Sequence, residues 1–331
     1  MDFPNIPKLK EDAAHALRRG REPKDLVLWY ALLSTLIAAA MTLLNYWLGE
    51  QISNTGGLSG MGTRTMLATA KAVLPLAQAL VLACLQLGYH QGMLRICRRQ
   101  YADRTDLKVG FQKVFPLIRM MLLEALVAFS FVVLSYYISS TIYLFTPWAD
   151  TMQALIAPLI QGTTVLDSSL VLTEEFLLQA APVVMPLLII WFIVMLVLLI
   201  PLSYRMRFAS YALLDDPNAK AFHALRTSMK MTRRKCRKLF RLDLSFWWFY
   251  ALALVVALVG YGDLFLSLLG ISLPMNATVS YFLFYGLYLA GNFAVNYFFL
   301  NQVQAAYAMA YESLREKPAN NGVVLGNIFD V

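Results

Sequence analysis

Long apolar runs recur along the whole chain, and they constrain its fold more than any other feature. A helix needs about 20 mostly apolar residues to cross the hydrocarbon core of a bilayer. Six runs reach that length, and they cover residues 26–48, 67–94, 114–145, 180–203, 244–269 and 278–300. Backbone polar groups in lipid must be satisfied within the protein, so each run is expected to be a helix. The sequence therefore predicts an all-α fold, a polytopic membrane helix bundle of six transmembrane helices.

The composition agrees with this fold class. Of the 331 residues, 59% are hydrophobic and only 15% are charged, which is typical of a membrane protein. Apolar runs occupy most of the chain, so residues 1–315 are predicted to form a single membrane domain. Residues 316–331 are expected to be a short, flexible cytoplasmic tail.

Positive charges predict the orientation of the chain, because short loops rich in Lys and Arg stay on the cytoplasmic side. Of the 28 Lys and Arg residues, 25 lie within residues 1–25, 95–113 and 205–241 or after residue 312. An even number of spans places all four segments on one side. We therefore expect a multi-pass membrane protein with both termini in the cytoplasm.

The densest basic charge lies in an amphipathic cytoplasmic segment, residues 204–243. Six Lys and Arg residues fall between Arg233 and Arg241. On a helical wheel one face collects the apolar side chains of Phe222, Leu225, Met229, Cys236 and Phe240. This pattern predicts a helix that lies on an anionic leaflet, or else an extension of a span that packs on its neighbours. The predicted anionic-lipid contacts are Lys230, Arg233, Arg234, Lys235, Arg237, Lys238 and Arg241.

A nucleic-acid partner is not expected for this basic segment. Such a role would need base-stacking aromatic residues or a recognisable binding fold beside the charge. Trp247 and Trp248 have the positions of interfacial belt residues at the start of the fifth run instead. The charge is therefore interpreted first as a topology signal.

Weak internal similarity suggests three copies of one unit. The stretch AHALRRG at 14–20 resembles FHALRTS at 222–228, and each precedes a pair of apolar runs. Between them, LKVGFQKVFPLIR at 107–119 has the same amphipathic character. Each unit would consist of an amphipathic cytoplasmic helix followed by a helical hairpin. Chance similarity among apolar helices is the alternative.

The second half of the chain also resembles a known family. The stretch from Ser203 to Tyr250 and the sequence QAAYAMAYESL at 304–314 are similar to an uncharacterised bacterial family of multi-spanning membrane proteins, domain of unknown function 975. The shared features are a basic helix and then Phe240, Leu242, Leu244, Ser245, Phe246 and Trp247. The family often has a glycine in the basic helix, where this chain reads MTRRKC. A more distant resemblance is to the membrane domain of some glycerophosphodiester phosphodiesterases. The resemblance implies a bacterial plasma-membrane protein and transfers no reaction.

The chain carries no pattern that indicates an enzyme, a metal or a cofactor. Its three histidines, His15, His90 and His223, are far apart in sequence and lack a second ligand at metal-binding spacing. No serine lies in a nucleophile-elbow sequence. We therefore predict no catalytic residues, no metal site and no cofactor.

Polar residues inside the apolar runs mark a candidate intramembrane site, because an unpaired charge in lipid costs several kcal/mol. Glu124 lies about 15 Å into the third run at 1.5 Å per residue. It is interpreted either as a hydrogen-bonded residue that locks helix packing or as a carboxylate beside an aqueous cavity. Its candidate partners lie on the second run. The full candidate set is Glu124, Arg119, His90, Tyr89, Asn292 and Asn296.

Gly88 and Gly92 in the second run have the spacing that permits close approach between helices. They predict either internal packing or contact with a second copy of the chain. A homo-oligomer or another membrane protein is therefore a possible partner.

Three classes of function are compatible with these features. The favoured class is a non-enzymatic membrane protein that handles lipids, above all anionic lipids of the cytoplasmic leaflet, or an amphipathic peptide, in transport, as a scaffold or as a resistance factor. The second is an ion-coupled transporter of small solutes that uses Glu124, although the repeats run parallel rather than inverted. The third and least favoured is a membrane-embedded enzyme.

Overall fold

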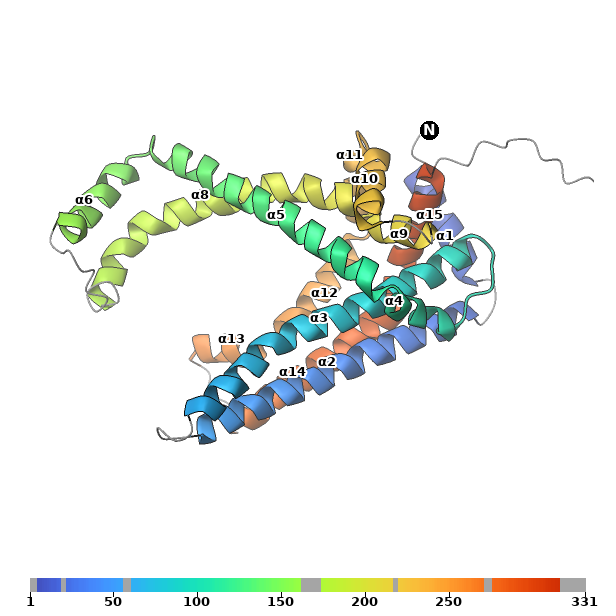
Figure 1. Ribbon diagram of the computed structural model, residues 1–331, viewed down its shortest axis with the longest axis horizontal. Coiled ribbons are helices and arrows are strands. Elements are labelled where there is room, and N and C mark those ends of the chain that lie inside the picture. Colours follow the sequence, from blue (N-terminus) through green and yellow to red (C-terminus); the bar gives the residue numbers. More distant parts are fainter. Residues whose placement is uncertain are drawn as a thin grey trace, which may run out of the picture. The chain divides into compact units, whose positions relative to one another are not determined.

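The computed structural model describes residues 5–18, 22–55, 61–161, 174–216, 220–270 and 276–315. Within these ranges every regular element is a helix, which confirms the predicted fold class (Figure 1). The chain divides into two compact units. Unit 1 comprises Met1–Ile118 and Phe208–Val331, and unit 2 comprises Arg119–Arg207. The predicted tail, 316–331, lies outside the described residues.

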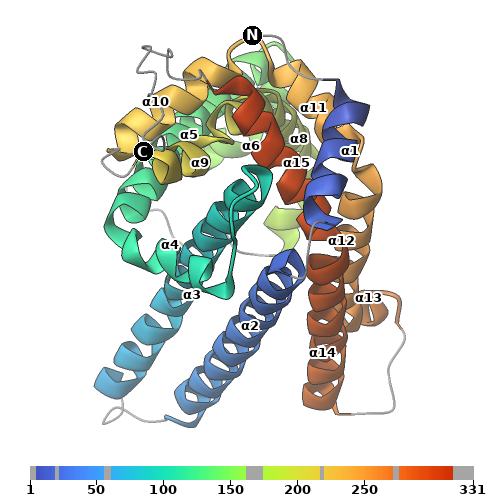
Figure 2. The ribbon, with the colours of Figure 1, turned by 90° about the vertical axis from the view of Figure 1, so that its right-hand side faces the viewer.

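Unit 1 contains the first two and the last two apolar runs and most of the basic segments. Its elements are α1 (Ile6–Arg18), α2 (Glu22–Asn54), α3 (Met61–Cys97), η2 (Arg104–Lys108), α4 (Val109–Gln112), α9 (Ala209–Asp215), α10 (Ala221–Thr232), α11 (Cys236–Leu244), α12 (Trp247–Gly260), α13 (Gly262–Leu268), α14 (Ala277–Val295), the π-helical segment η3 (Asn296–Leu300) and α15 (Asn301–Leu314). Figure 2 shows the spans α2, α3 and α14, with α1 and α15 at one end of them.

Unit 2 is a hairpin of two long apolar helices. Most of α5 (Val114–Tyr143) runs out, α6 (Trp148–Gln161) lies at the turn, and α8 (Glu174–Met206) runs back. The Tyr143 hydroxyl oxygen lies 2.8 Å from the carbonyl oxygen of Val183 and 3.1 Å from that of Trp148, so its one hydrogen can donate to either and the side chain contacts all three helices.

Five described helices are long and apolar enough to cross a membrane, which supports a multi-pass protein. The fifth predicted run, 244–269, differs from the prediction because it is not one helix. Its α12 has 14 residues, about 21 Å at 1.5 Å per residue, which is shorter than a hydrocarbon core of about 30 Å. The helices α11 and α12 form a pair bent by 65°, and they supply a sixth crossing when counted together.

Three amphipathic segments precede the outward spans, and we call them leading segments: α1, then η2 with α4, then α10. The helices that return from the membrane at the same end are the end of α3, then α9, then α15, and we call them return helices. Leading segment η2–α4 packs on α3, and α10 packs on α9. Helix α1 packs on α15, beside which it lies in Figure 2. The second and third leading segments thus each pack on the return helix that precedes them in the chain. The first leading segment, α1, packs on the last return helix, α15.

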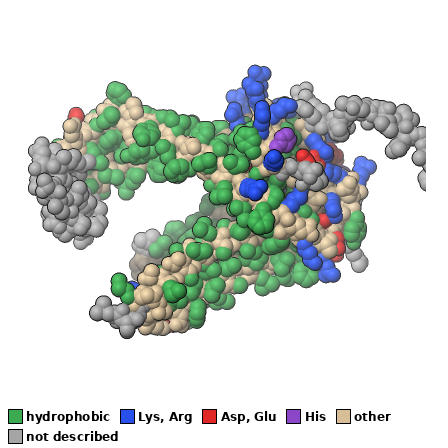
Figure 3. Space-filling model, in the orientation of Figure 1, with side chains coloured by type: hydrophobic (Ala, Val, Ile, Leu, Met, Phe, Trp, Pro, Cys, Tyr) green, Lys and Arg blue, Asp and Glu red, His purple; other side chains and the backbone are tan. Residues whose placement is uncertain are grey.

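This end of unit 1 is also where the basic side chains gather, and we call it the basic end. Figure 3 shows Lys and Arg side chains clustered at α10 and α11, while apolar side chains cover the spans. The buried core lies at the same end, with Met93 of α3, Phe208 before α9 and Tyr311 of α15 each at most 2% exposed. Many span residues, such as Leu36 and Leu76, are exposed, as expected for a surface that faces lipid.

The structure corrects the predicted continuous amphipathic helix in the basic segment. Arg234 adopts a positive φ of 64° and separates α10 from α11, so the two helices do not share one helical wheel. Leu225 is buried, whereas Phe222 and Phe240 are exposed. The buried face of α10 packs on α9, which is the alternative in which the segment packs on its neighbours.

Candidate functional site

An ion-pair network joins the ends of the three return helices. Arg98, just after α3, donates to the carboxylates of Asp215 at the end of α9 (2.7 Å) and Glu312 of α15. Arg315 pairs with the second oxygen of Asp215 at 2.8 Å. Burial by itself lowers the pKa of Arg98, but the hydrogen bonds to Glu312 and Asp215 outweigh it and raise the pKa. Every charge in the network has an opposite partner, so we assign it to structure.

A group of stacked aromatic rings lies next to this network, and it includes two of the predicted polar residues, His90 and Tyr89. His90 stacks on Tyr211 with ring centres 4.7 Å apart, and its Nδ1 lies 3.1 Å from the Ser210 hydroxyl oxygen. Tyr89 stacks on Tyr30 at 4.2 Å. The hydroxyl group of Tyr89 is buried and has no hydrogen-bond partner within the described part of the chain. Both residues therefore belong to the packed core of the basic end.

The other predicted intramembrane residues have local surroundings of their own. Asn296 donates to the side chain of Asn292 at 3.4 Å, where α14 passes into the π-helical turn η3. Glu124 and Arg119 both lie on α5 in unit 2, where Glu124 is half-buried and Arg119 is exposed. Among the described residues of unit 2, the Glu124 carboxylate has no hydrogen-bond or ion-pair partner.

The predicted lipid contacts lie on and between α10 and α11. Lys230, Arg233, Arg234, Arg237, Lys238 and Arg241 are exposed, and Lys235 is half-buried. The apolar residues Leu239 and Leu242 of α11 are buried. Nearby, Lys10 of α1 donates to the carbonyl oxygen of Ser245 (3.1 Å) and lies 4.4 Å from the ring centre of Phe246. These basic side chains thus surround a packed helix junction.

A different part of the basic end is hollowed into a groove of about 380 Å³. It lies where α2, α3 and the second leading segment meet. Its floor and walls are mostly apolar, and two cations stand at its rim. The residues that line it are Trp29, Leu33, Leu85, Arg104, Thr105, Leu107, Lys108 and Phe111. We call it the basic groove.

Two glycines set the wall of the basic groove by letting η2–α4 approach α3 closely. A Cβ atom at Gly88 would collide with the backbone of Leu107, and one at Gly110 would collide with the carbonyl oxygen of Cys84. Gly92 meets the side chain of Leu26 in α2. The predicted glycine pair Gly88 and Gly92 therefore serves internal packing.

Hydrogen bonds fix the start of the second leading segment. Asp103 and Asp106 form a reciprocal capping box at the start of η2, which satisfies backbone N–H groups at the helix start. The buried Asp106 carboxylate pairs with Arg95 of α3 at 2.6 Å. Burial raises the pKa of Asp106, against the lowering effects of the Asp103 backbone hydrogen bond and of Arg95.

The rim of the basic groove carries charge that the protein does not neutralise. The Arg104 guanidinium group lies 5.9 Å from the ring centre of Trp29, and both Arg104 and Lys108 are exposed. Neither side-chain cation has an ion-pair partner in the described ranges. The groove therefore offers apolar contacts below and two positive charges above, which suits an amphipathic anion.

Trp29, which lines the basic groove, is one of two tryptophans near the ends of the apolar part of α2. Trp29 and Trp47 are 18 residues apart on α2, about 27 Å at 1.5 Å per residue, which is close to the thickness of a hydrocarbon core. Tryptophan favours both interfaces of a bilayer. The spacing of the two tryptophans therefore matches the two interfaces that a membrane span of this length would reach.

None of the groove residues was among the predicted lipid contacts. The weak signal in the sequence is the pair Arg104 and Lys108, four residues apart and interleaved with Leu107 and Phe111. That pattern is short and carries less charge than the run from Arg233 to Arg241. No family model, curated protein or solved structure matches the chain.

Proposed function

We propose that this chain is a non-enzymatic protein of the bacterial plasma membrane that binds an anionic lipid in the basic groove. Both termini are proposed to be cytoplasmic, which puts the groove in the cytoplasmic leaflet. The lipid phosphate would lie between Arg104 and Lys108, and an acyl chain would cover Leu33, Leu85 and Phe111. The observation that carries the proposal is the combination of an apolar floor and an unpaired cationic rim.

The charge distribution supports a lipid over a soluble anion. Each Lys or Arg near an anionic leaflet contributes about 1 kcal/mol, so the two rim cations together contribute about 2 kcal/mol, roughly 30-fold in affinity. The apolar lining adds burial of hydrocarbon, at about 0.8 kcal/mol per CH₂ group. A soluble phosphate would gain only from the charges. The same groove would also suit an amphipathic peptide that carries acidic side chains beside an apolar face.

The test is native mass spectrometry of the protein released from nanodiscs that contain phosphatidylglycerol in a phosphatidylcholine background. The wild type should retain phosphatidylglycerol at a fixed stoichiometry, and the double variant Arg104→Gln with Lys108→Gln should lose it. The matched control is Arg233→Gln with Arg234→Gln, which removes two exposed cations of the same end. Equal retention in the groove variant and the wild type would refute the proposal.

A further inference from the structure

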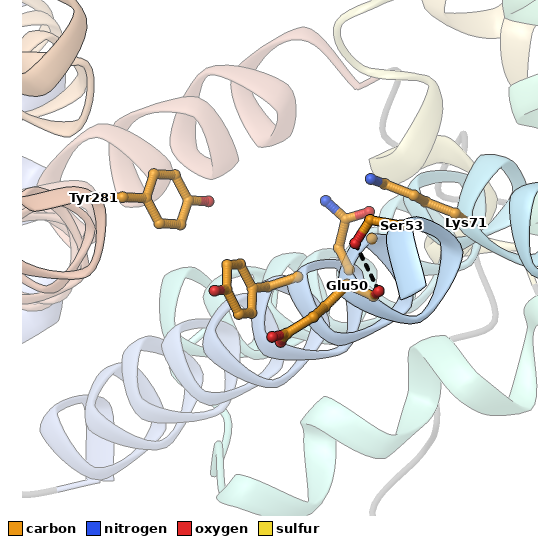
Figure 4. Close-up of a pocket in the computed structure, with 7 residues that line it drawn as sticks. Glu50, Ser53, Lys71 and Tyr281 are labelled. Carbon is orange, nitrogen blue, oxygen red and sulfur yellow. Dashed lines mark hydrogen bonds between the residues drawn. The ribbon is translucent and has the colours of Figure 1, made fainter. Parts of the chain in front are cut away.

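A second cavity lies at the opposite end of unit 1 and has a different chemical character. Its volume is about 520 Å³, and it is formed by α2, α3 and α14 (Figure 4). Its lining is rich in polar side chains and includes one cation and one anion. The residues are Asn45, Tyr46, Gly49, Glu50, Ser53, Lys71 and Tyr281. We call it the far-end pocket.

The far-end pocket lies near the far ends of the apolar runs of α2 and α3. Tyr46 is adjacent in sequence to Trp47, which is about 27 Å along α2 from Trp29 at 1.5 Å per residue. Glu50 is one helical turn beyond Tyr46. On α3, Lys71 precedes Arg95 by 24 residues, about 36 Å of helix. Glu50 therefore lies just beyond the apolar run 26–48, and Lys71 lies one helical turn inside the run 67–94, near the same end of unit 1.

Lys71 and Glu50 both line the pocket, and they do not form an ion pair with each other. Lys71 is half-buried and its ammonium group rests on the backbone of α2, because a Cβ atom at Gly49 would lie 2.9 Å from the Lys71 Nζ. Figure 4 shows this ammonium group and the Tyr281 hydroxyl group directed toward the pocket from opposite sides. Across the described ranges, neither the Lys71 ammonium group nor the Glu50 carboxylate has a hydrogen-bond or ion-pair partner.

Contacts between α2 and α14 hold the two sides of the pocket in place. The Thr42 and Tyr285 hydroxyl oxygens are 2.6 Å apart, and Tyr285 also donates to the carbonyl oxygen of Ala38 (3.2 Å). The rings of Tyr46 and Phe282 meet edge to face at 5.0 Å. The pocket is thus preformed between paired helices, which lowers the cost of ordering on binding.

We infer that the far-end pocket binds a zwitterionic group that carries a primary ammonium and a phosphate or carboxylate. Lys71 donates to the anionic part. The Glu50 carboxylate and the tyrosine hydroxyl oxygens accept from the ammonium part, and the Asn45 amide can serve either. An ion of one sign would leave the opposite charge of the pocket unpaired. The ligand is either the headgroup of a phosphatidylethanolamine-like lipid or a soluble zwitterion with the same groups.

Two arms of one experiment separate these sources. In the first arm, nanodiscs contain phosphatidylethanolamine in a phosphatidylcholine background, and native mass spectrometry counts the retained lipid. In the second arm, isothermal titration calorimetry measures binding of soluble phosphoethanolamine to the protein in phosphatidylcholine nanodiscs. Binding in the first arm alone identifies a lipid headgroup, and binding in the second identifies a soluble ligand. No binding in either arm overturns the inference.

The variants test which residues hold the ligand. Lys71→Gln and Glu50→Gln should each weaken binding about tenfold, the effect of one charged hydrogen bond of about 1.5 kcal/mol. The charge exchange Lys71→Glu with Glu50→Lys should bind more tightly than either single variant, because it restores one charge of each sign. The control Arg64→Gln removes an exposed cation two helical turns earlier on α3 and should leave binding unchanged. Unchanged binding in both single variants, or an equal loss in the control, would overturn the inference.

This site is independent of the basic groove. The groove variant Arg104→Gln with Lys108→Gln should keep zwitterion binding, and Lys71→Gln should keep phosphatidylglycerol in the groove. Failure of one proposal is therefore visible without failure of the other.

Discussion

The second and third leading segments of unit 1 differ in how they use their basic residues. The third, α10, packs its small and apolar face on α9, and its cations surround a closed helix junction. The second, η2–α4, approaches α3 backbone to backbone and leaves an apolar groove beneath Arg104 and Lys108. The comparison shows that the densest positive charge and the open apolar groove lie on different segments of the same end.

The largest expected effect comes from closing the glycine contact that defines the second segment. In Gly110→Ala the new Cβ atom would collide with the carbonyl oxygen of Cys84, and overpacking of this kind costs about 3 kcal/mol. Thermal unfolding should therefore occur at a clearly lower temperature. The control is Gly286→Ala, where no atom lies within 4 Å of the new Cβ. Equal melting temperatures for the two variants would contradict the close approach of η2–α4 to α3.

A smaller loss is expected when the capping box is removed. Asp106→Ala deletes one half of the capping box of η2, the carboxylate that accepts from the Asp103 backbone N–H, and it also deletes the partner of Arg95. Because the Arg95 side chain is 39% exposed, water screens part of the pair, and we expect a loss of about 1–2 kcal/mol. Chemical denaturation in detergent measures it. Asp12→Ala, at an exposed position of α1, should change stability by less, and a reversed order would show that η2 does not depend on this cap.

The two segments should also differ in lipid retention. Loss of Arg104 and Lys108 should remove the retained phosphatidylglycerol, whereas Arg233→Ala, Arg234→Ala and Lys235→Ala together should leave its stoichiometry intact. The triple variant should only weaken general attraction to anionic vesicles, by about 1 kcal/mol per charge. Sedimentation with vesicles separates that effect from stoichiometric retention. Loss of the retained lipid in the triple variant would place the lipid-binding site at the third leading segment instead of the second.

The smallest effect is expected at the junction of α10 and α11. Arg234 has φ of 64°, a region that glycine adopts more readily than other residues. Arg234→Gly should therefore be neutral or stabilising by up to about 1 kcal/mol. A lower melting temperature would show that contacts of the Arg234 side chain stabilise the fold by more than its backbone strain costs.

The spans could be predicted from the sequence because each depends on a local property, the length of an apolar run. The run 67–94 lies inside α3 (Met61–Cys97), and 180–203 lies inside α8 (Glu174–Met206). The break at Arg234 could not be predicted, because no glycine or proline marks it. The 65° bend between α11 and α12 likewise has no glycine or proline at the junction.

The candidate site was harder to predict than the spans because it depends on contacts between distant segments. Gly88 was recognised as a point of close approach, but the sequence did not show that its neighbour is the backbone of Leu107. The network of Arg98, Asp215 and Glu312 joins residues more than 90 positions apart. These ion pairs form only where the ends of the three return helices pack together, so the sequence alone does not identify the partners.

The most direct test of the basic groove is a photocrosslink to lipid from within it. A photoreactive phenylalanine analogue placed at Phe111, which lines the groove, is compared with one at Phe222, an exposed position of α10. In membranes that contain phosphatidylglycerol, the adduct at position 111 should form with that lipid in excess over its share of the bilayer and should fall when Arg104 and Lys108 are neutralised. An adduct at 222 that is equally enriched, or one at 111 that merely follows bulk lipid composition, would contradict a specific lipid site in the groove.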